Sequence, residues 1–106
     1  MEERSVNIIV LNWNQRDLSL KCISSLEKTT YKNKHIVFVD NGSNDGSSES
    51  VQRQHPGVEI VELENNLGYA GGNNLGFNSI RNKSKYTIFL NNDTYVDPCF
   101  IEPLID

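Results

Sequence analysis

The feature that most constrains the fold is a series of short apolar runs, rich in β-branched residues, that alternates with segments of helical character. The runs occupy residues 6–11, 35–40, 58–64 and 85–91, and their lengths are typical of strands. Continuous apolar runs are typical of strands that are buried on both faces of a sheet. Alternation with helices over short loops therefore predicts a parallel sheet with helices on both of its faces.

The first helix is expected within residues 15–29, where one apolar stripe has helical spacing. The stripe is formed by Leu18, Cys22, Ile23 and Leu26. Asn14 can cap this helix. A short second helix is expected to end near Gln54, after the turn cluster at residues 41–48.

A third helix is expected near residues 71–82, after a loop rich in Gly and Asn. A fourth is expected to begin with Asp97 as its cap and Pro98 in its first position, with Phe100, Ile101, Leu104 and Ile105 at helical spacing. Right-handed crossovers then restrict the topology, and we predict a doubly wound α/β sheet with strand order 3-2-1-4. Run 58–64 carries Glu at three positions, which favours an edge strand.

Polar residues follow each predicted strand. These are Asn12-Trp13-Asn14, Asp40-Asn41-Gly42-Ser43, Asn65-Asn66-Leu67-Gly68 and Asn91-Asn92-Asp93. Turn formation explains polar residues at one or two such strand ends. Four of them at the carboxyl edge favour a ligand site in the crevice where the strand order reverses.

Several classes of ligand-binding domain are not compatible with the residues at these strand ends. The first strand is followed by "NWNQRD", which lacks the glycines of a dinucleotide-binding turn, and the sequence contains no Walker A motif. A receiver domain needs acids after its first strand, where Asn12 and Asn14 stand. A calcium loop over residues 41–52 would have Ser43 and Asp45 in place but lacks the bidentate Glu at Gln52.

Four motifs occur in order at the strand ends: "VLNWN", "VDNGSNDGS", "NLGYAGGNNLG" and "LNNDTYVDP". Together they resemble the family 2 glycosyltransferases of GT-A fold, and in particular a rhamnosyltransferase-like branch, over residues 6–106. The resemblance implies that residues 1–106 are the N-terminal, nucleotide-sugar-binding part of such an enzyme. It implies inverting transfer from a UDP- or dTDP-sugar to a glycan or lipid-linked acceptor. The acceptor-binding part and the catalytic base are expected beyond residue 106, because Glu102 and Asp106 do not fit the base position, so residues 1–106 alone are expected to be inactive.

The resemblance also assigns residues to the donor. It places Asn12, Trp13 and Asn14 at the base and ribose, Asp40 at the pyrimidine, and Asn66, Gly68 and Asn74 near the ribose and sugar–phosphate. Asn41, Asn91 and Asn92 are also expected to bind the nucleotide-sugar, the last two within a D-x-D-like motif. A carboxylate such as Asp40 can accept the N3–H of uracil or thymine. Three alternatives stay open: Trp13 as a core aromatic, Asp40 as a turn cap, and Gly71 and Gly72 as packing glycines rather than an anion cradle.

The resemblance implies that Asp93 ligates a divalent metal, Mg²⁺ or Mn²⁺, that bridges the donor diphosphate. The first acid of this D-x-D-like motif is replaced by Asn91, and Asn92 is expected to be a spacer. Because Mg²⁺ needs only one or two carboxylates when phosphate and water complete its shell, Asp93 is chemically sufficient with nucleotide bound. We expect weak metal binding without nucleotide.

The remaining composition narrows the class of protein. A net charge of −4 and a pI near 5.1 argue against nucleic acid and anionic membranes as partners. The apolar runs are too short to span a bilayer, the N-terminus lacks a signal-peptide pattern, and Cys22 and Cys99 have no disulfide or zinc spacing. A cytoplasmic setting is expected, with membrane association of a full-length protein left open.

Two other classes remain open at this point: a nucleotidyltransferase-like or regulatory nucleotide-binding domain, and a non-catalytic interaction module. We also expect that the unpaired edge of strand 85–91 can template a homodimer.

Overall fold

The computed structural model describes residues 4–80 and 84–105. In chain order its elements are β1 (Val6–Asn12), α1 (Arg16–Glu27), β2 (Lys34–Asn41), α2 (Ser47–Gln54), β3 (Glu59–Leu63), α3 (Gly68–Ser79), β4 (Tyr86–Asn91) and α4 (Ile101–Ile105). The sheet order is β3-β2-β1-β4, and every pair is parallel. The predicted doubly wound layout is therefore confirmed.

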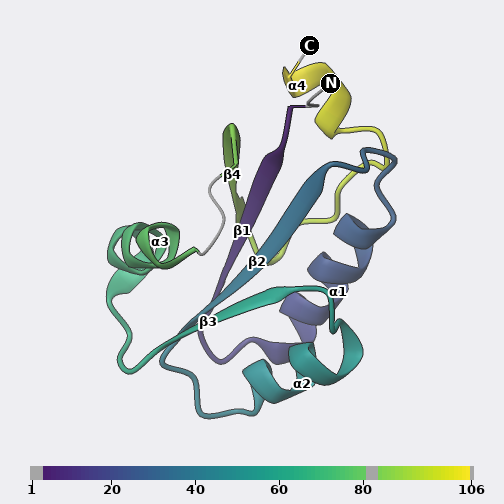
Figure 1. Ribbon diagram of the computed structural model, residues 1–106. Coiled ribbons are helices and arrows are strands. Elements are labelled where there is room, and N and C mark those ends of the chain that lie inside the picture. Colours follow the sequence, from purple (N-terminus) through teal and green to yellow (C-terminus); the bar gives the residue numbers. More distant parts are fainter. Residues whose placement is uncertain (1–3, 81–83, 106) are drawn as a thin grey trace.

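The sheet separates two layers of helices. Helix α3 covers one face, and α1 and α2 cover the other (Figure 1). The register pairs Asn12 of β1 with Asp40 of β2, and Leu11 of β1 with Asn91 of β4. The carboxyl ends of the three strands are thus level with one another, at the edge where the strand order reverses.

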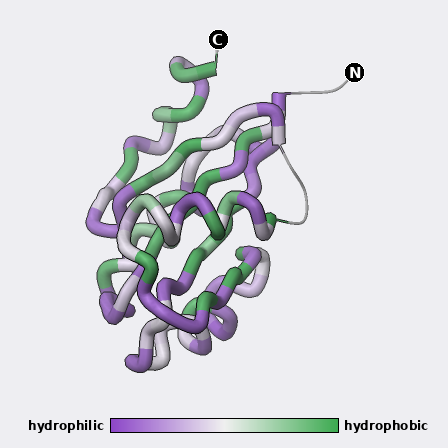
Figure 2. Tube along the Cα trace, turned by 90° about the vertical axis from the view of Figure 1, so that its left-hand side faces the viewer, coloured by the Kyte–Doolittle hydropathy of each residue, from purple (hydrophilic) through white to green (hydrophobic). Residues whose placement is uncertain are grey.

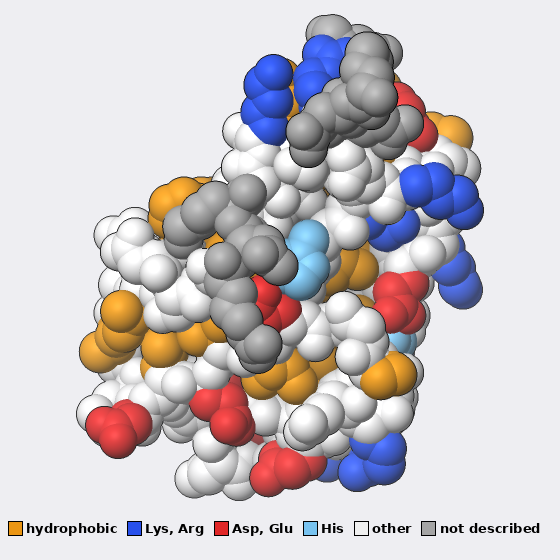
Figure 3. Space-filling view, viewed as in Figure 1, with side chains coloured by type: hydrophobic (Ala, Val, Ile, Leu, Met, Phe, Trp, Pro, Cys, Tyr) orange, Lys and Arg blue, Asp and Glu red, His pale blue; other side chains and the backbone are white. Residues whose placement is uncertain are grey.

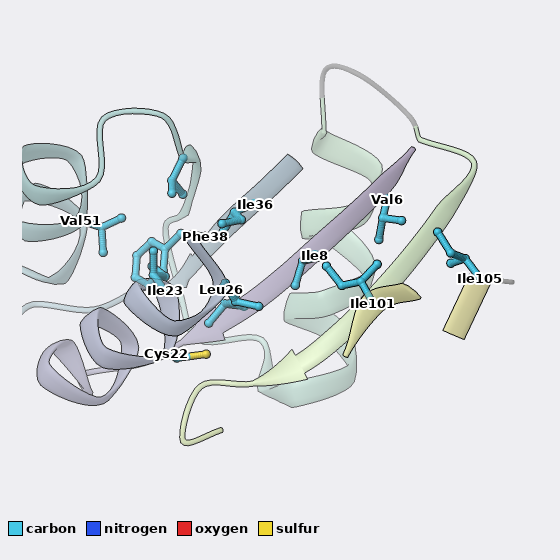
Figure 4. Close-up of a cluster of buried hydrophobic side chains, with 12 residues drawn as sticks. Val6, Ile8, Cys22, Ile23, Leu26, Ile36, Phe38, Val51, Ile101 and Ile105 are labelled. Atoms are coloured by element: carbon cyan, nitrogen blue, oxygen red, sulfur yellow. The ribbon is translucent and has the colours of Figure 1, made fainter. Parts of the chain in front are cut away.

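Side-chain alternation along the strands builds a core on each face. Val6, Ile8 and Val10 of β1 pack with α1, α2 and α4, whereas Ile9 packs on the α3 side with Val37 and Val39. Figure 4 shows Ile101 and Ile105 of α4 beside Val6 and Ile8, so α4 covers the same face as α1. Figure 2 shows hydrophobic segments in the interior and hydrophilic ones in the loops at the lower end.

The same alternation determines the face of the sheet on which each polar residue at a strand end lies. Asn12 and Asp40 follow Val10 and Phe38 on the α1 side, whereas Asn41 follows Val39 on the α3 side. The sheet therefore divides the tips between its two faces before any loop geometry is considered.

Helix α3 begins at Gly68, three residues before the predicted start, and the predicted stretch at residues 81–82 lies outside the described residues. The glycines are consequently inside the helix. A Cβ on Gly72 would lie 2.8 Å from Nδ2 of Asn41, and one on Gly76 would lie 2.6 Å from Cγ2 of Val39. For these two positions the glycines serve close packing of α3 on the sheet.

Two predicted helix starts are wrong. Asn14 is not the cap of α1: the residue before the helix is Gln15, and Asn14 has a left-handed φ of 52°. Helix α4 begins at Ile101 rather than at Pro98, because Asp97 forms a turn of its own. Its Oδ1 accepts the Cys99 N–H at 2.8 Å, and its carbonyl accepts the Phe100 N–H at 3.0 Å.

The predicted apolar stripe of α1 is buried at Cys22, Ile23 and Leu26, but Leu18 is 41% exposed. The predicted edge position of β3 is confirmed. Within residues 4–80 and 84–105, no helix combines the length and the apolar character that a bilayer crossing requires.

Candidate functional site

A cavity of about 340 Å³ lies at the carboxyl edge of the sheet, between the tips of β1, β2 and β4 and the start of α3. Its lining consists of Leu11, Asn12, Trp13, Gln15, Asn41, Asn66, Gly68, Tyr69, Asn91, Asn92 and Asp93. Eight of the eleven predicted site residues are in this lining. The other three, Asn14, Asp40 and Asn74, are not.

Asp40 is only 5% exposed. Its Oδ1 accepts Nδ2 of Asn12 and the N–H of Ser43, both at 3.3 Å, and its Oδ2 accepts the hydroxyl of Ser48 at 2.8 Å. The turn contact to Ser43 is therefore present. A carboxylate has about four acceptor positions, and three of those of Asp40 are used by described residues. One position remains for a ligand, and base recognition by Asp40 stays a prediction.

Asn41 and Asn66 hold the loop between β3 and α3. Nδ2 of Asn41 donates to Oδ1 of Asn66 and to the carbonyl of Gly68, both at 3.1 Å, and its Oδ1 accepts the Leu67 N–H at 2.9 Å. Oδ1 of Asn66 also accepts the Gly68 N–H at 2.8 Å. Both amide protons of Asn41 are thus used in the scaffold. Among the described residues, Nδ2 of Asn66 has no hydrogen-bond partner and is left for a ligand on this side of the cavity.

Asn14 joins the two loops that follow β1 and β2. Its N–H donates to Oγ of Ser43 at 2.8 Å, and its Oδ1 accepts the Asn44 N–H at 2.9 Å. Asn tolerates the left-handed conformation better than most residues, which explains its presence at this position. The side chain lines a neighbouring cavity with Arg16 and Asp45 rather than the candidate site.

Asp45 ties the same loop to the start of α1. Its carboxylate accepts the N–H of Ser47 at 3.0 Å and of Arg16 at 3.2 Å, as well as the Ser47 hydroxyl. Burial raises the pKa of this carboxyl, but the hydrogen bonds outweigh it, and the pKa lies below its ordinary value. Among the described residues no group of three His, Cys, Asp or Glu could hold a metal.

Two aromatic rings border the cavity. Trp13 is 50% exposed and Tyr69 is 57% exposed, so the core alternative for Trp13 is wrong. Sequence reasoning missed Tyr69, although it directly follows Gly68 in the third motif. It also missed Gln15 and Ser19, for which the sequence carried no signal. Aromatic rings at the rim of a polar cavity can stack on a planar base.

The end of β4 and the loop after it line the cavity with three consecutive residues, of which the first and third are exposed. Asn91 and Asp93 are exposed, whereas Asn92 is held towards α1: its Nδ2 donates to Oε1 of Gln15 and to Oγ of Ser19, both at 3.0 Å. Asn92 is therefore an anchor rather than the expected spacer. Sγ of Cys22 lies 3.9 Å from the Asn91 carbonyl and provides a second contact from α1.

Asn74 is exposed on α3 away from the cavity lining, and its neighbour Asn73 is the buried one. The assignment of Asn74 stays a prediction. Gly68 and Tyr69, by contrast, put the N-terminus of α3 at the cavity. The first N–H groups of a helix lack partners within it. Those of Leu67 and Gly68 are donated to Asn41 and Asn66, so the N–H groups that follow Gly68 are the ones that can face an anion.

The charges decide between this cavity and a larger one of about 670 Å³ beside β3. The larger cavity is lined by His35 and by the carboxylates of Glu49, Glu59 and Glu62. Among the residues that the structure describes, Asp93 is the one charged side chain in the lining of the smaller cavity. A phosphate-bearing ligand would meet three carboxylates in the first and one in the second, so the smaller cavity is the better candidate.

Comparison with known proteins identifies the family of the chain. The family model described as glycosyl transferase family 2 matches residues 7–106. The glycosyltransferases GlyA and GlyG of Streptococcus pneumoniae are each 29% identical to the chain over 93% of its length. The chain spans 14% of GlyA and 33% of GlyG, so it corresponds to a minor part of these relatives.

Solved structures share the fold. The structure of S. aureus TarS 1-349 in complex with UDP matches with a TM-score of 0.81 at 20% identity, over 94% of this chain and 30% of that one. The mannosyltransferase PcManGT from Pyrobaculum calidifontis, in complex with GDP-Man and Mn²⁺, matches with a TM-score of 0.74 at 23% identity, over 83% of this chain and 27% of that one. The sheet order 3-2-1-4 is thus that of the GT-A, Rossmann-like fold. With the family model covering almost its whole length, the chain belongs to glycosyl transferase family 2.

Proposed function

We propose that the chain binds the nucleoside diphosphate part of a UDP- or dTDP-sugar for a glycosyltransferase. The observation that carries the proposal is the cavity at the carboxyl edge, where aromatic rings, amide groups and one carboxylate meet. Trp13 and Tyr69 offer faces for a base, and the N-terminus of α3 offers N–H groups to phosphate. Structural neighbours whose complexes contain UDP or a nucleotide-sugar support the ligand class.

The composition of the cavity is compatible with a divalent metal. Its lining contains Asp93 but neither Lys nor Arg, so a diphosphate beside Asp93 needs a cation from elsewhere. Asp93 would hold Mg²⁺ or Mn²⁺, with Asn91 next to it as a neutral oxygen donor. Such a cation neutralises the charge that develops on a leaving nucleoside diphosphate. The Mn²⁺ in the complex of PcManGT supports this choice.

The proposed reaction is an inverting displacement in which an acceptor hydroxyl attacks the anomeric carbon and the nucleoside diphosphate leaves. The acceptor is a glycan or a lipid-linked sugar, and the branch is the rhamnosyltransferase-like one. Glu102 does not serve as the base, because its Oε2 accepts the Thr30 hydroxyl at 2.7 Å and α4 packs beside Val6 at the opposite end of β1. The base is proposed to lie outside residues 1–106.

Calorimetric titration tests the proposal. The 106-residue chain is titrated with UDP and dTDP, each with Mn²⁺ and with EDTA. We expect saturable binding that Mn²⁺ strengthens. Asp93→Asn should reduce the gain in nucleotide affinity from Mn²⁺ by at least roughly tenfold, since loss of even a residue that hydrogen-bonds to a metal ligand changes metal affinity by that much.

Asp97→Asn is the matched control, because Asp97 is exposed on the same segment but does not line the cavity. It should bind like the wild type. A preference for UTP over UDP would favour the nucleotidyltransferase-like alternative. Absence of binding to any nucleotide would refute the proposal.

A further inference from the structure

A chain of hydrogen bonds runs beneath the cavity from β2 to the loop after β4. Oδ1 of Asp40 accepts Nδ2 of Asn12 at 3.3 Å, and Oδ1 of Asn12 accepts the hydroxyl of Ser19 at 2.7 Å. Oγ of Ser19 accepts Nδ2 of Asn92 at 3.0 Å, and that nitrogen also donates to Gln15. Ser19 is therefore the link between two strand tips that have no direct contact in this chain of bonds.

The chemistry of the groups fixes the direction of every bond. An ionised carboxylate can only accept, so the amide nitrogen of Asn12 must face Asp40 and its oxygen must face α1. The hydroxyl of Ser19 has one proton, which it donates to that oxygen. Its remaining lone pairs can be met by the amide nitrogen of Asn92 and not by the amide oxygen. The orientation of Asn92 is thus dictated from Asp40 through Ser19.

Burial makes this chain costly to break. Asn12 and Ser19 are both 0% exposed, and Asp40 is 5% exposed. Both protons of the Asn12 amide are used, since its nitrogen also donates to Oγ of Ser43 at 3.0 Å. Water cannot replace a lost partner at such a site without rearrangement, so each group has one favourable orientation.

All three residues 91–93 line the cavity, and the two on either side of Asn92 are the more exposed ones. Asn91 and Asp93 are exposed and line it, while Asn92 is held on the side of α1. Cys22 lies one turn after Ser19 on the same face of α1, and its Sγ contacts the carbonyl of Asn91. One face of α1 therefore fixes the backbone on which Asp93 is carried.

We propose that Ser19 is a positioning residue of the donor site: through Asn92 it holds loop 91–93 so that Asp93 faces the cavity. The role in donor binding rests on the function proposed above. The hydrogen-bonded link does not, because it exists in the chain without any ligand.

The first measurement needs no ligand. In ¹⁵N-labelled protein, the side-chain amide protons of Asn92 should exchange slowly with solvent in the wild type and faster in Ser19→Ala. Ser24→Ala is the matched control, because Ser24 lies on α1 but its hydroxyl faces His55 at 3.5 Å. Equal exchange in all three proteins would overturn the link.

The second measurement compares the affinity for UDP in Mn²⁺ with that in EDTA. Ser19→Ala leaves the carboxylate of Asp40 with all three of its donors, so the affinity in EDTA should change little. The gain from Mn²⁺ should fall by roughly tenfold, the change expected when one buried hydrogen bond is lost. If Ser19 served folding alone, Ser19→Ala would change the affinity for UDP by the same factor in Mn²⁺ and in EDTA.

Asn92→Ala provides a second route, because Asn92 is in a partly exposed loop where folding tolerates truncation. It should reduce the gain from Mn²⁺ like Ser19→Ala, and the double variant should lose no more than either single variant. If Mn²⁺ raised the affinity for UDP in both single variants as much as in the wild type, the proposal would be overturned. No UDP binding by the wild type would instead refute the proposed function, and the amide exchange would then decide the link by itself.

Discussion

At the scale of single residues, the site separates into side chains that build it and side chains that are left for a ligand. Asn12, Asn41 and Asn92 use their amide groups in internal hydrogen bonds. Asn91 and Asp93 line the cavity on either side of Asn92. An Asn-rich edge is therefore mostly scaffold, because an amide both donates and accepts and can join neighbouring loops.

Cys22 belongs to this scaffold. Burial raises the pKa of its thiol to about 11 from an ordinary 9.0; a hydrogen bond from the Thr94 N–H acts in the opposite direction, and the nearby charge of Asp93 adds to the rise. The neutral thiol is thus the stable form beneath loop 91–93. Folding stability from this group is fully present below pH 9.0 and is lost as the pH rises through 11.

We predict that iodoacetamide at pH 8 modifies Cys99 and leaves Cys22 intact, because Cys99 is exposed whereas Cys22 is buried and protonated. Peptide mass spectrometry measures both sites in one sample, and addition of urea should make Cys22 reactive. The urea midpoint should fall between pH 9 and 11 in the wild type. It should fall less in Cys22→Val. Rapid labelling of native Cys22 would contradict this account.

At the scale of elements, the close approach of α3 to the sheet sets the shape of the cavity. Gly72 and Gly76 lie one turn apart and leave no room for a Cβ against Asn41 and Val39. Gly42 makes a similar approach between loops: its φ is 80°, and a Cβ there would lie 2.8 Å from the carbonyl carbon of Asn65. These contacts bring the N-terminus of α3 to the strand tips.

We predict that Gly76→Ala destabilises the fold. The new Cβ would lie 2.6 Å and 2.9 Å from the two methyl carbons of Val39, which is fully buried. Overpacking of this kind costs about 1–3 kcal/mol, against about 1 kcal/mol gained from the helix propensity of Ala. Urea unfolding followed by circular dichroism gives the difference.

Gly57→Ala is the control for that measurement. A Cβ on Gly57 meets nothing within 4 Å, so its stability should stay within about 1 kcal/mol of the wild type. An increase in stability for Gly76→Ala would show that α3 can move away from the sheet, and the account of its close packing would be wrong.

At the scale of the whole molecule, the two edges of the sheet differ. The β3 edge carries Glu59 and Glu62, which discourage pairing with another chain. Strand β4 carries no charged residue, and Phe89 on it is 45% exposed. Figure 3 shows hydrophobic side chains along the margin over α3, whereas acidic ones lie across the lower half. We therefore expect a partner chain at the β4 edge rather than at the β3 edge.

We predict concentration-dependent dimers of the 106-residue chain that pair through β4. Light scattering after size exclusion should give a mass between monomer and dimer that rises with loading. Phe89→Lys should shift the population to monomer, because an edge lysine opposes strand pairing. Glu62→Lys on β3 is the control and should leave the mass unchanged. A monomer at all loadings would contradict the prediction.

The sequence by itself determined the architecture. Runs such as residues 6–11 and 35–40 are strands because β-branched apolar residues pack well on a pleated surface, and right-handed crossovers then leave few orders for four parallel strands. The same pattern put Asn12, Asp40 and Asn91 at one edge, since the carboxyl ends of parallel strands must meet there. These features of the fold follow from local sequence patterns or from the handedness of the crossover connections.

Only the tertiary structure decided which atoms are left for a ligand. The partners of Asn12 and Asn92 lie up to 31 and 77 positions away along the chain, and no periodicity encodes such pairs. The start of α3 at Gly68 likewise depends on Asn41 and Asn66, which replace a local cap. Sequence patterns report burial and turn chemistry, whereas the roles within this site depend on hydrogen bonds between distant residues.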